Sequence, residues 1–286
     1  MTIAVVTDST AYLPGELNGT YELTIVPLTV VINGWGGLEG LEVSPAEVAR
    51  ALTARRAAVS TSRPAPSQFA EEYRRLLDAG ADGVVSVHLS AKLSGTYEAA
   101  QLAAAEVGPR VRVVDSGTAA MGLGFPALAA AAAARQGHDL ETVTRAAVDN
   151  AAAVTTLFYV DTLEFLRRGG RIGAAEALLG TALSVKPILH VENGAVVVRD
   201  KVRTAGRALT RLVDLAVEAA GDGEADVAVH HLGTPDRAAA LVEDLRARLG
   251  DRLRDCYLTE VGAVVAAHTG PGLAGVVVHK RVGVRD

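Results

Sequence analysis

The sequence predicts an α/β fold with two domains: an N-terminal, largely parallel sheet flanked by helices, and a C-terminal α/β domain with a mixed or antiparallel sheet. In the first half, short and nearly continuously apolar runs alternate with Ala- and Leu-rich stretches, which is typical of parallel strands covered by helices. In the second half, Asn193-Gly194 separates two strand-like runs and favours a hairpin, because it accepts positive φ. The 286 residues suffice for two domains, which we place at 1–150 and 151–286, with the boundary near Asn150.

The elements expected in the first half follow from apolar continuity and from proline positions. Three runs have the composition of buried strands: Ile3–Thr7, Gly83–Val87 and Val111–Val114. Helical composition is found in three further stretches: Pro45–Arg56, Pro66–Ala79 and Gly95–Val107. Proline at positions 45 and 66 suits the first turn of a helix, and the alternation predicts right-handed βαβ units.

The Ala-rich stretch Ala119–Ala134 is expected to form a buried helix, because it is shorter than the ~18–20 apolar residues of a membrane span. No integral membrane segment is therefore expected. Within it, Gly122 to Ala127 fits the pattern G-x-G-x-x-A. A dinucleotide site needs these glycines directly after a strand, so we interpret them as helix-packing residues.

The elements expected in the second half alternate less regularly. Strand composition is found in six runs: Val154–Val160, Ser184–His190, Ala195–Arg199, Val227–His231, Leu253–Thr259 and Gly275–His279. A helix is expected at Pro235–Leu249. His230 and His231 are adjacent on a strand and point to opposite faces, so a structural or surface role is favoured over a shared metal ion.

Composition excludes several classes of function. A net charge of -5 and 4% aromatic residues give neither the basic footprint nor the stacking surfaces of a nucleic-acid-binding protein. The single Cys256 excludes a disulfide framework and predicts a cytoplasmic protein. The sequence has no P-loop, no G-x-S-x-G and no H-E-x-x-H motif, so no cofactor and no metal site are expected.

Two segments rich in hydroxyl side chains are expected to form turns that precede helices. Thr61 and Ser62 lie in the first, and Ser94, followed by Gly95, lies in the second, after the strand that ends near Val87. Ligands of α/β proteins bind at the carboxyl ends of parallel strands, and hydroxyl and N–H groups at a helix N-terminus bind anions. Each hydroxyl could instead simply cap its helix. Two such segments favour a carboxylate or phosphate site.

Three further segments carry cations or histidine beside turn residues. Arg171 follows Gly169-Gly170, His268-Thr269 precedes Gly-Pro-Gly, and Arg203 precedes an expected helix at Thr204. Each has a plainer explanation: a helix C-cap for the arginine after the glycines, and solvated side chains for the other two segments.

These segments, taken in order, resemble the DegV family. The resemblance covers nearly the whole chain and rests on these motifs: Val6-Thr7-Asp8-Ser9-Thr10, Thr61-Ser62-x-Pro64, Leu93-Ser94-Gly95-Thr96-Tyr97, Val114-Asp115-Ser116, Tyr159-Val160-Asp161-Thr162-Leu163-Glu164, Gly169-Gly170-Arg171-Ile172-Gly173, Ser184-Val185-Lys186-Pro187-Ile188-Leu189 and His268-Thr269-Gly270-Pro271-Gly272.

The resemblance implies a non-catalytic bacterial fatty-acid-binding protein. In that family an acyl chain lies in an apolar tunnel between the domains, and members of the fatty acid kinase system present its carboxylate to a separate ATP-dependent kinase subunit, which forms an acyl phosphate. The family then implies these ligand-binding residues: Thr61, Ser62, Ser94, Gly95, His268 and Thr269. It ties Arg171, Arg203 and His268 to phosphoryl transfer or kinase docking. Arg63 stands where family members often carry a neutral residue such as Gln, and it receives no role.

Two other functions remain open at this point. One is an acyl hydrolase or transferase that uses Ser94 with His268, against which the absence of a nucleophile-elbow motif counts. The other is a lipid sensor that acts without a kinase.

Overall fold

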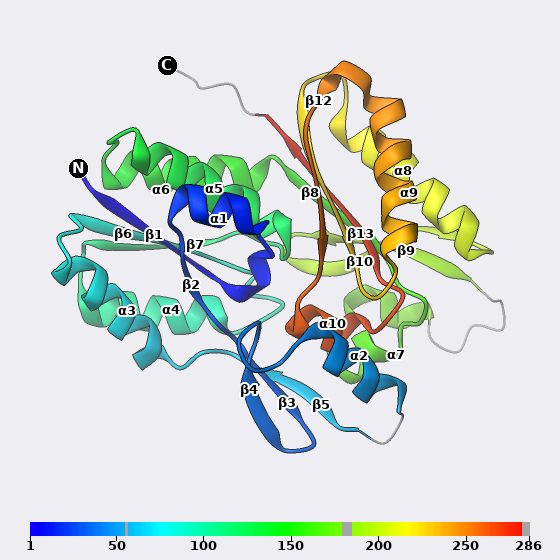
Figure 1. Ribbon diagram of the computed structural model, residues 1–286, viewed down its shortest axis with the longest axis horizontal. Helices are drawn as coiled ribbons and strands as arrows, with labels where there is room; N and C mark the ends of the chain where they lie inside the picture. The colour runs from blue at the N-terminus through cyan, green and yellow to red at the C-terminus, as the bar shows by residue number, and fades with distance from the viewer. Residues whose placement is uncertain (55–56, 179–184, 282–286) are drawn as a thin grey trace.

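The computed structural model describes residues 1–54, 57–178 and 185–281, which form three sheets (Figure 1). The first sheet is parallel throughout and has the order β2-β1-β6-β7. Its strands are β1 (Ile3–Asp8), β2 (Thr24–Val26), β6 (Gly83–His88) and β7 (Val111–Asp115). The three strands expected in the first half are confirmed, and each extends one residue further.

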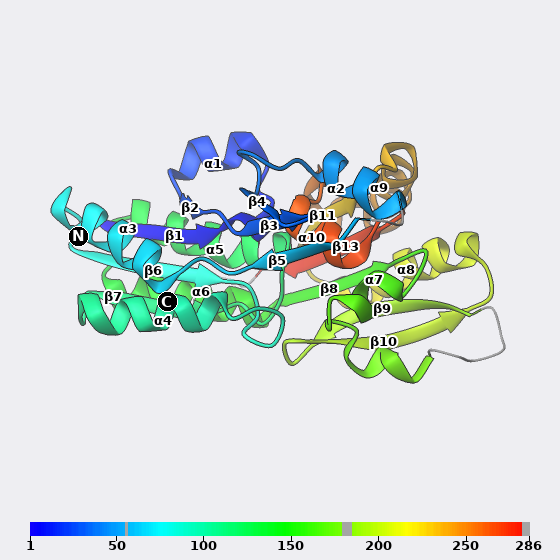
Figure 2. The same ribbon diagram turned by 90° about the horizontal axis from the view of Figure 1, so that it is seen from below.

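Helices cover both faces of the first sheet, as Figures 1 and 2 show. They are α1 (Gly15–Tyr21), α3 (Pro66–Asp78), α4 (Thr96–Val107), α5 (Met121–Arg135) and α6 (Leu140–Ala152). Val6 and Val84 face α3 and α4, whereas their neighbours Val5 and Val85 face α5 and α6. This alternation explains why both strands are apolar along their whole length.

The Ala-rich stretch forms α5, as expected, and its glycines serve close packing. A Cβ added at Gly124 would lie 3.1 Å from the carbonyl oxygen of Ala11. The G-x-G-x-x-A pattern therefore lies within a packed helix and does not begin one directly after a strand.

The second sheet is mixed and has the order β10-β9-β8-β13-β11-β12. Its strands are β8 (Val154–Tyr159), β9 (Lys186–Glu192), β10 (Ala195–Val202), β11 (Ala225–His231), β12 (Leu253–Glu260) and β13 (Ala274–Lys280). β11 and β12 pair in parallel and the other pairs are antiparallel. Asn193 and Gly194 have φ of 49° and 83° in the β9–β10 hairpin, which confirms that prediction. Ser184, expected in β9, lies outside the described residues.

The two faces of the second sheet are covered differently. The expected helix α9 (Pro235–Leu249) and α8 (Ala205–Ala220) pack on one face. The opposite face carries α2 (Pro45–Thr53), α7 (Glu164–Arg168) and α10 (Ala263–Thr269). Short 3-10 helices lie at Ser9–Ala11, Gly173–Leu178 and Gly250–Arg252. None of the helices in the described ranges is long and apolar enough to cross a membrane.

The sequence did not predict the third sheet. It is antiparallel, with the order β4-β3-β5, and comprises β3 (Thr29–Ile32), β4 (Trp35–Leu38) and β5 (Val59–Ser62). Val30 of β3 and Val48 of α2 share a core with Val261 and Val264 near α10. A segment from the first half of the chain thus packs onto the face of the second sheet that α10 covers.

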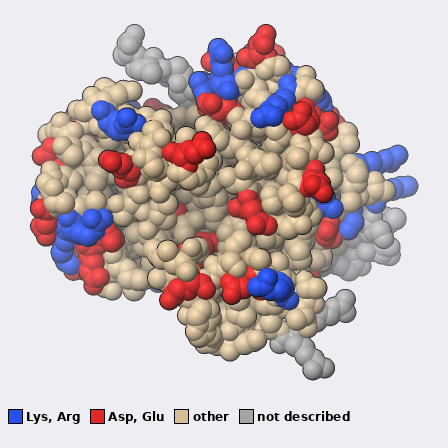
Figure 3. All heavy atoms as spheres, in the orientation of Figure 1, with Lys and Arg blue, Asp and Glu red and all other residues tan. Residues whose placement is uncertain are grey.

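Acidic and basic side chains are interspersed on the face that Figure 3 shows. Such a surface differs from the basic stripe that nucleic-acid-binding proteins present.

Candidate functional site

A cavity of about 420 Å³ is lined by strand residues of the second and third sheets and by loop residues, including Leu89, which follows β6 of the first sheet. Its volume falls in the range of small-molecule sites, ~300–1,000 Å³. Most of its wall is aliphatic, with Phe158 as an aromatic member. The apolar residues are Leu28, Leu89, Leu93, Ala119, Ala120, Leu157, Phe158, Leu166, Val191, Val196, Val261, Val264, Val265, Leu273 and Val277.

Polar residues and one glycine, from four separate segments, also line this cavity. They include all six residues expected to bind the ligand, together with Arg63 and Arg171: Thr61, Ser62, Arg63, Ser94, Gly95, Arg171, His268 and Thr269. We call this group the polar end. Arg203 is not among the described residues that line the cavity; it is exposed between β10 and α8. Thr204 caps α8, as its expected helix start requires, by accepting a hydrogen bond from the Arg207 N–H.

Thr61 is held by a strand, which corrects the expectation of a turn. The segment Val59–Ser62 is β5, and Thr61 pairs with Val30 of β3. The β-branched residues Val59 and Thr61 suit a strand, and neither Thr61 nor Ser62 caps α3, whose N-cap is Ala65. From β5, the hydroxyl oxygen of Thr61 lies 2.9 Å from Nε2 of His268.

His268 is a neutral imidazole with one free ring nitrogen. Burial, and next the positive charge of Arg171, lower its pKa to about 4. Its Nδ1 is buried and has no hydrogen-bond partner among the described residues. A Cβ added at Gly169 would lie 2.1 Å from this atom, so only glycine permits the approach. The ring therefore bonds to the Thr61 hydroxyl at the cavity without carrying charge, and its Nδ1 lies against Gly169.

Arg171 brings a positive charge to the polar end. Its Nε donates to the carbonyl oxygen of Leu93 over 2.9 Å, and its Nη1 donates to that of Gly169 over 2.6 Å. Two backbone carbonyls thus orient the guanidinium. The helix C-cap explanation applies better to Arg167 and Arg168, which end α7 and pair with Glu164.

Ser94 and Gly95 lie directly before α4. The Ser94 hydroxyl hydrogen-bonds to the Thr96 hydroxyl over 2.9 Å and accepts from the Thr96 N–H, while Gly95 is the N-cap. A Cβ added at Gly95 would lie 2.3 Å from Nη1 of Arg63. Gly95 therefore makes room for Arg63, whose Nη1 donates to the Gly95 carbonyl and to Glu98.

His230, for which the sequence favours a structural or surface role, also lines the cavity. It is 2% exposed, and burial lowers its pKa to about 4. Nε2 accepts from the Met121 N–H over 3.2 Å, so Nδ1 carries the proton and donates to the Thr259 hydroxyl over 2.8 Å. Both nitrogens are satisfied within the fold. The adjacent His230 and His231 carry no sequence pattern that indicates which of them lines a cavity.

No cluster of three or more His, Cys, Asp or Glu side chains that could hold a metal ion occurs in the part of the chain that the structure describes. The polar end is built instead from hydroxyls, an imidazole and guanidinium groups, which are donors for an anionic oxygen.

Comparison with known proteins places the chain in a family. The model of the DegV family, described as an uncharacterised protein family, matches residues 2–281. A DegV domain-containing protein of Streptomyces coelicolor is 54% identical over 279 residues, covering 98% of this chain and 99% of the relative. One from Mycobacterium tuberculosis is 41% identical over 282 residues, covering 97% of each chain.

Solved structures show the same fold. A DegV family protein of Thermus thermophilus, described as binding fatty acid, is 37% identical with a TM-score of 0.92, over 98% of this chain and 100% of the other. DegV of Bacillus subtilis, described as a fatty acid binding protein, is 33% identical with a TM-score of 0.88 over the same shares. By its sequence and its fold, the chain belongs to the DegV family.

Proposed function

We propose that this protein binds one long-chain fatty acid in the cavity, with the carboxylate at the polar end and the acyl chain along the aliphatic wall. The observation that carries the proposal is that one cavity joins that wall to Thr61, Ser94, Arg171 and His268. The Thermus thermophilus and Bacillus subtilis relatives, described as fatty acid binding, support it. In this proposal the acyl chain lies between the predicted domains, 1–150 and 151–286.

The cavity wall suits the energetics of such a ligand. Each buried methylene contributes about 0.8 kcal/mol, so the acyl chain supplies most of the affinity. A carboxylate removed from water needs hydrogen bonds to offset its desolvation. The hydroxyls of Thr61 and Ser94 and the guanidinium of Arg171 are the donors that we assign to it.

We further propose that the protein presents this carboxylate to a separate ATP-dependent kinase and catalyses no step itself. A carboxylate oxygen attacks the γ-phosphorus of ATP, and the bond from that phosphorus to the β,γ-bridging oxygen breaks. ADP leaves, and the acyl phosphate remains bound to the protein. In this proposal Arg171 and His268, which line the cavity, stabilise the charge that develops on the phosphoryl group, and the exposed Arg203 docks the kinase.

The geometry does not favour an acyl hydrolase. A serine nucleophile needs a base within hydrogen-bond reach. Ser94 bonds to Thr96, and His268 bonds to Thr61; within the described residues no hydrogen bond joins Ser94 to His268. An ester-substrate assay on lipid-free protein tests this directly. Ester hydrolysis that Ser94→Ala abolishes would support the hydrolase function instead.

Titration of delipidated protein with a long-chain fatty acid and with its methyl ester tests the binding proposal. Both ligands bury the same chain, but only the acid carries a carboxylate, so we expect the acid to bind at least about 10-fold more tightly. Equal affinities would overturn the head-group assignment. A pull-down that recovers an ATP-binding partner, followed by acyl phosphate formation, tests the kinase step; a lipid sensor would show neither.

A further inference from the structure

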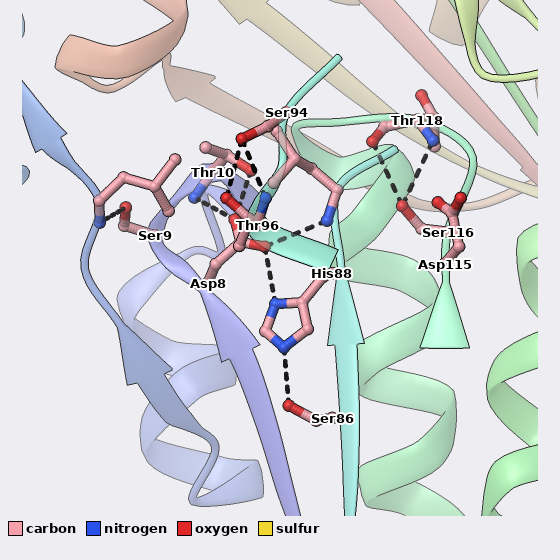
Figure 4. A network of polar contacts seen from close by, with 12 residues as sticks. Asp8, Ser9, Thr10, Ser86, His88, Ser94, Thr96, Asp115, Ser116 and Thr118 are labelled. Carbon is pink, nitrogen blue, oxygen red and sulfur yellow. Dashed lines mark hydrogen bonds and ion pairs between the residues drawn. The ribbon is translucent and has the colours of Figure 1, made fainter. Parts of the chain in front are cut away.

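The turn after β1 is bonded to the segments that carry the polar end. We call Asp8, Ser9 and Thr10 the β1 turn; Figure 4 shows its hydrogen bonds. Asp8 is fully buried, and its Oδ1 accepts from the backbone N–H and the hydroxyl of Thr10 over 3.0 and 2.6 Å. None of the described residues that line the cavity belongs to this turn.

The first connection runs from Asp8 to the loop that carries Ser94. Oδ2 of Asp8 accepts from the Leu89 N–H over 3.1 Å and contacts Nδ1 of His88 over 3.0 Å. Leu89 opens the loop, and one residue later the Ser90 carbonyl accepts from the Ser94 N–H over 3.0 Å. The Asp8 carboxylate therefore fixes the start of the loop, and through the Ser90 carbonyl it helps to position Ser94.

This carboxylate is itself fixed by a buried chain of hydrogen bonds. Tyr73 donates to the Ser86 hydroxyl over 2.8 Å, which leaves the Ser86 proton for Nε2 of His88, 2.7 Å away. Nδ1 of His88 then carries the ring proton and donates to Asp8. All four side chains are fully buried, so the chain of bonds is rigid and shielded from water.

The second connection runs from Ser9 to the helix that carries His268. The Ser9 hydroxyl donates to the buried carboxylate of Glu39, which accepts from the Val264 N–H over 2.7 Å in the first turn of α10. Tyr12 also donates to Glu39, over 3.1 Å, and accepts from the Val265 N–H. His268 lies in the last turn of the same helix.

The third connection runs from Ser9 to the third sheet. The Ser9 hydroxyl oxygen accepts from the Leu28 N–H over 3.0 Å, directly before β3 begins. Within that sheet Val30 of β3 pairs with Thr61 of β5. One hydroxyl is thus linked through Leu28 and β3 to the strand that holds Thr61, and through Glu39 to the helix that holds its partner His268.

We propose that Asp8 and Ser9 are positioning residues of the carboxylate site: they hold Ser94, Thr61 and His268 in register without touching the ligand. The inference rests on the proposed function of the polar end. Thr61 and Ser94, two of the donors assigned to the carboxylate, and His268, which bonds to Thr61, come from separate segments. They bind one carboxylate well only if their spacing is fixed before the ligand arrives, because a displacement of ~1 Å is costly. The β1 turn is linked to all three segments, through Leu89, through Leu28 and β3, and through Glu39.

The test compares Ser9→Ala with Thr7→Val. Thr7 lies two residues away on β1, is fully buried, and its hydroxyl has no partner among the described residues, so its loss breaks no connection. The probes are palmitate or oleate labelled with 13C at the carboxyl carbon, whichever binds the wild type more tightly, and the matching methyl ester. The measurements are both affinities, the 13C shift of the bound carboxylate, and Tm.

We expect Ser9→Ala to weaken binding of the acid by about 10-fold and to move the 13C shift, with ester affinity nearly unchanged. Thr7→Val should leave both affinities and the shift as in the wild type, whatever its Tm. A Ser9→Ala protein with a lower Tm but wild-type acid affinity and 13C shift would overturn the inference, as would equal losses for acid and ester.

Two further outcomes keep the test decisive. If Ser9→Ala does not fold, Glu39→Gln carries the test, because it keeps the side-chain shape while removing the carboxylate that joins Ser9 to α10; the same expectations and the same contradicting results apply. If the wild type binds acid and ester equally, the proposed function fails. If the wild type binds the acid more tightly than the ester and Ser9→Ala does so to the same degree, only the positioning role is overturned.

Discussion

Replacing Thr61 with valine removes one hydroxyl from the polar end while keeping the β-branched shape that β5 requires. Two losses follow, and they affect different quantities. A hydrogen bond to a charged carboxylate is worth about 1.5–3 kcal/mol, so fatty acid affinity should fall by about 10- to 150-fold. Separately, Nε2 of His268 loses its partner at 2.9 Å while Nδ1 already has none, which should lower the free energy of unfolding by about 1–3 kcal/mol.

Calorimetric titration of delipidated protein measures the first loss, and denaturant unfolding measures the second. Ser60→Ala is the matched control, because Ser60 is an exposed hydroxyl residue of the same strand that is not among the described residues lining the cavity. Wild-type affinity in Thr61→Val would refute the head-group assignment. An equal loss for the methyl ester would also refute it, since the cavity wall and not the hydrogen bond would then be damaged.

Three further predictions concern the histidines and arginines. His230 and His268 have pKa values of about 4 in the folded protein, below the ordinary 6.5. Between pH 6.5 and pH 4 the unfolded chain therefore binds more protons than the folded protein, so stability falls as the pH falls through this window. At about 1.4 kcal/mol per pKa unit, the loss in the free energy of unfolding approaches about 3 kcal/mol for His230. Denaturant unfolding at pH 7 and at pH 4.5 should therefore show a smaller loss in His230→Gln than in the wild type. An identical loss in the two proteins would contradict the pKa assignment. Arg63→Gln should change the free energy of unfolding by less than about 1 kcal/mol, because Arg63 and its partner Glu98 are exposed. It should, however, reduce the salt dependence of fatty acid affinity, measured by titration. An unchanged salt dependence would count against an effect of the Arg63 charge on binding. Arg203→Ala should retain wild-type fatty acid affinity and lose acyl phosphate formation with the kinase, whereas normal turnover would remove Arg203 from docking.

The sequence predicts the elements whose residues signal locally. Apolar continuity identifies β1, β6 and β7, because strands covered on both faces need apolar residues at every position. Asn193-Gly194 identifies the β9–β10 hairpin, because few other residue pairs accept positive φ at both positions. Both signals lie within a few residues and need no knowledge of the rest of the fold.

The third sheet and the contacts of the site lack such a signal. β4 contains Gly36 and Gly37, and β5 is a short, largely hydroxyl-bearing strand, so neither shows the apolar pattern of a core strand. Thr61 and His268 lie 207 residues apart, and their contact depends on packing between the third sheet and α10. Motif order identifies these residues, but only the tertiary structure shows that they bond to each other and that Glu39 connects their segments.

The most direct test of the central claim is native mass spectrometry of the freshly purified protein, with extraction and identification of any bound lipid. The cavity joins an aliphatic wall to a cluster of hydroxyl, imidazole and guanidinium groups, so we predict one long-chain fatty acid per chain, released on denaturation. Protein that carries no lipid and binds no fatty acid when titrated would contradict the account.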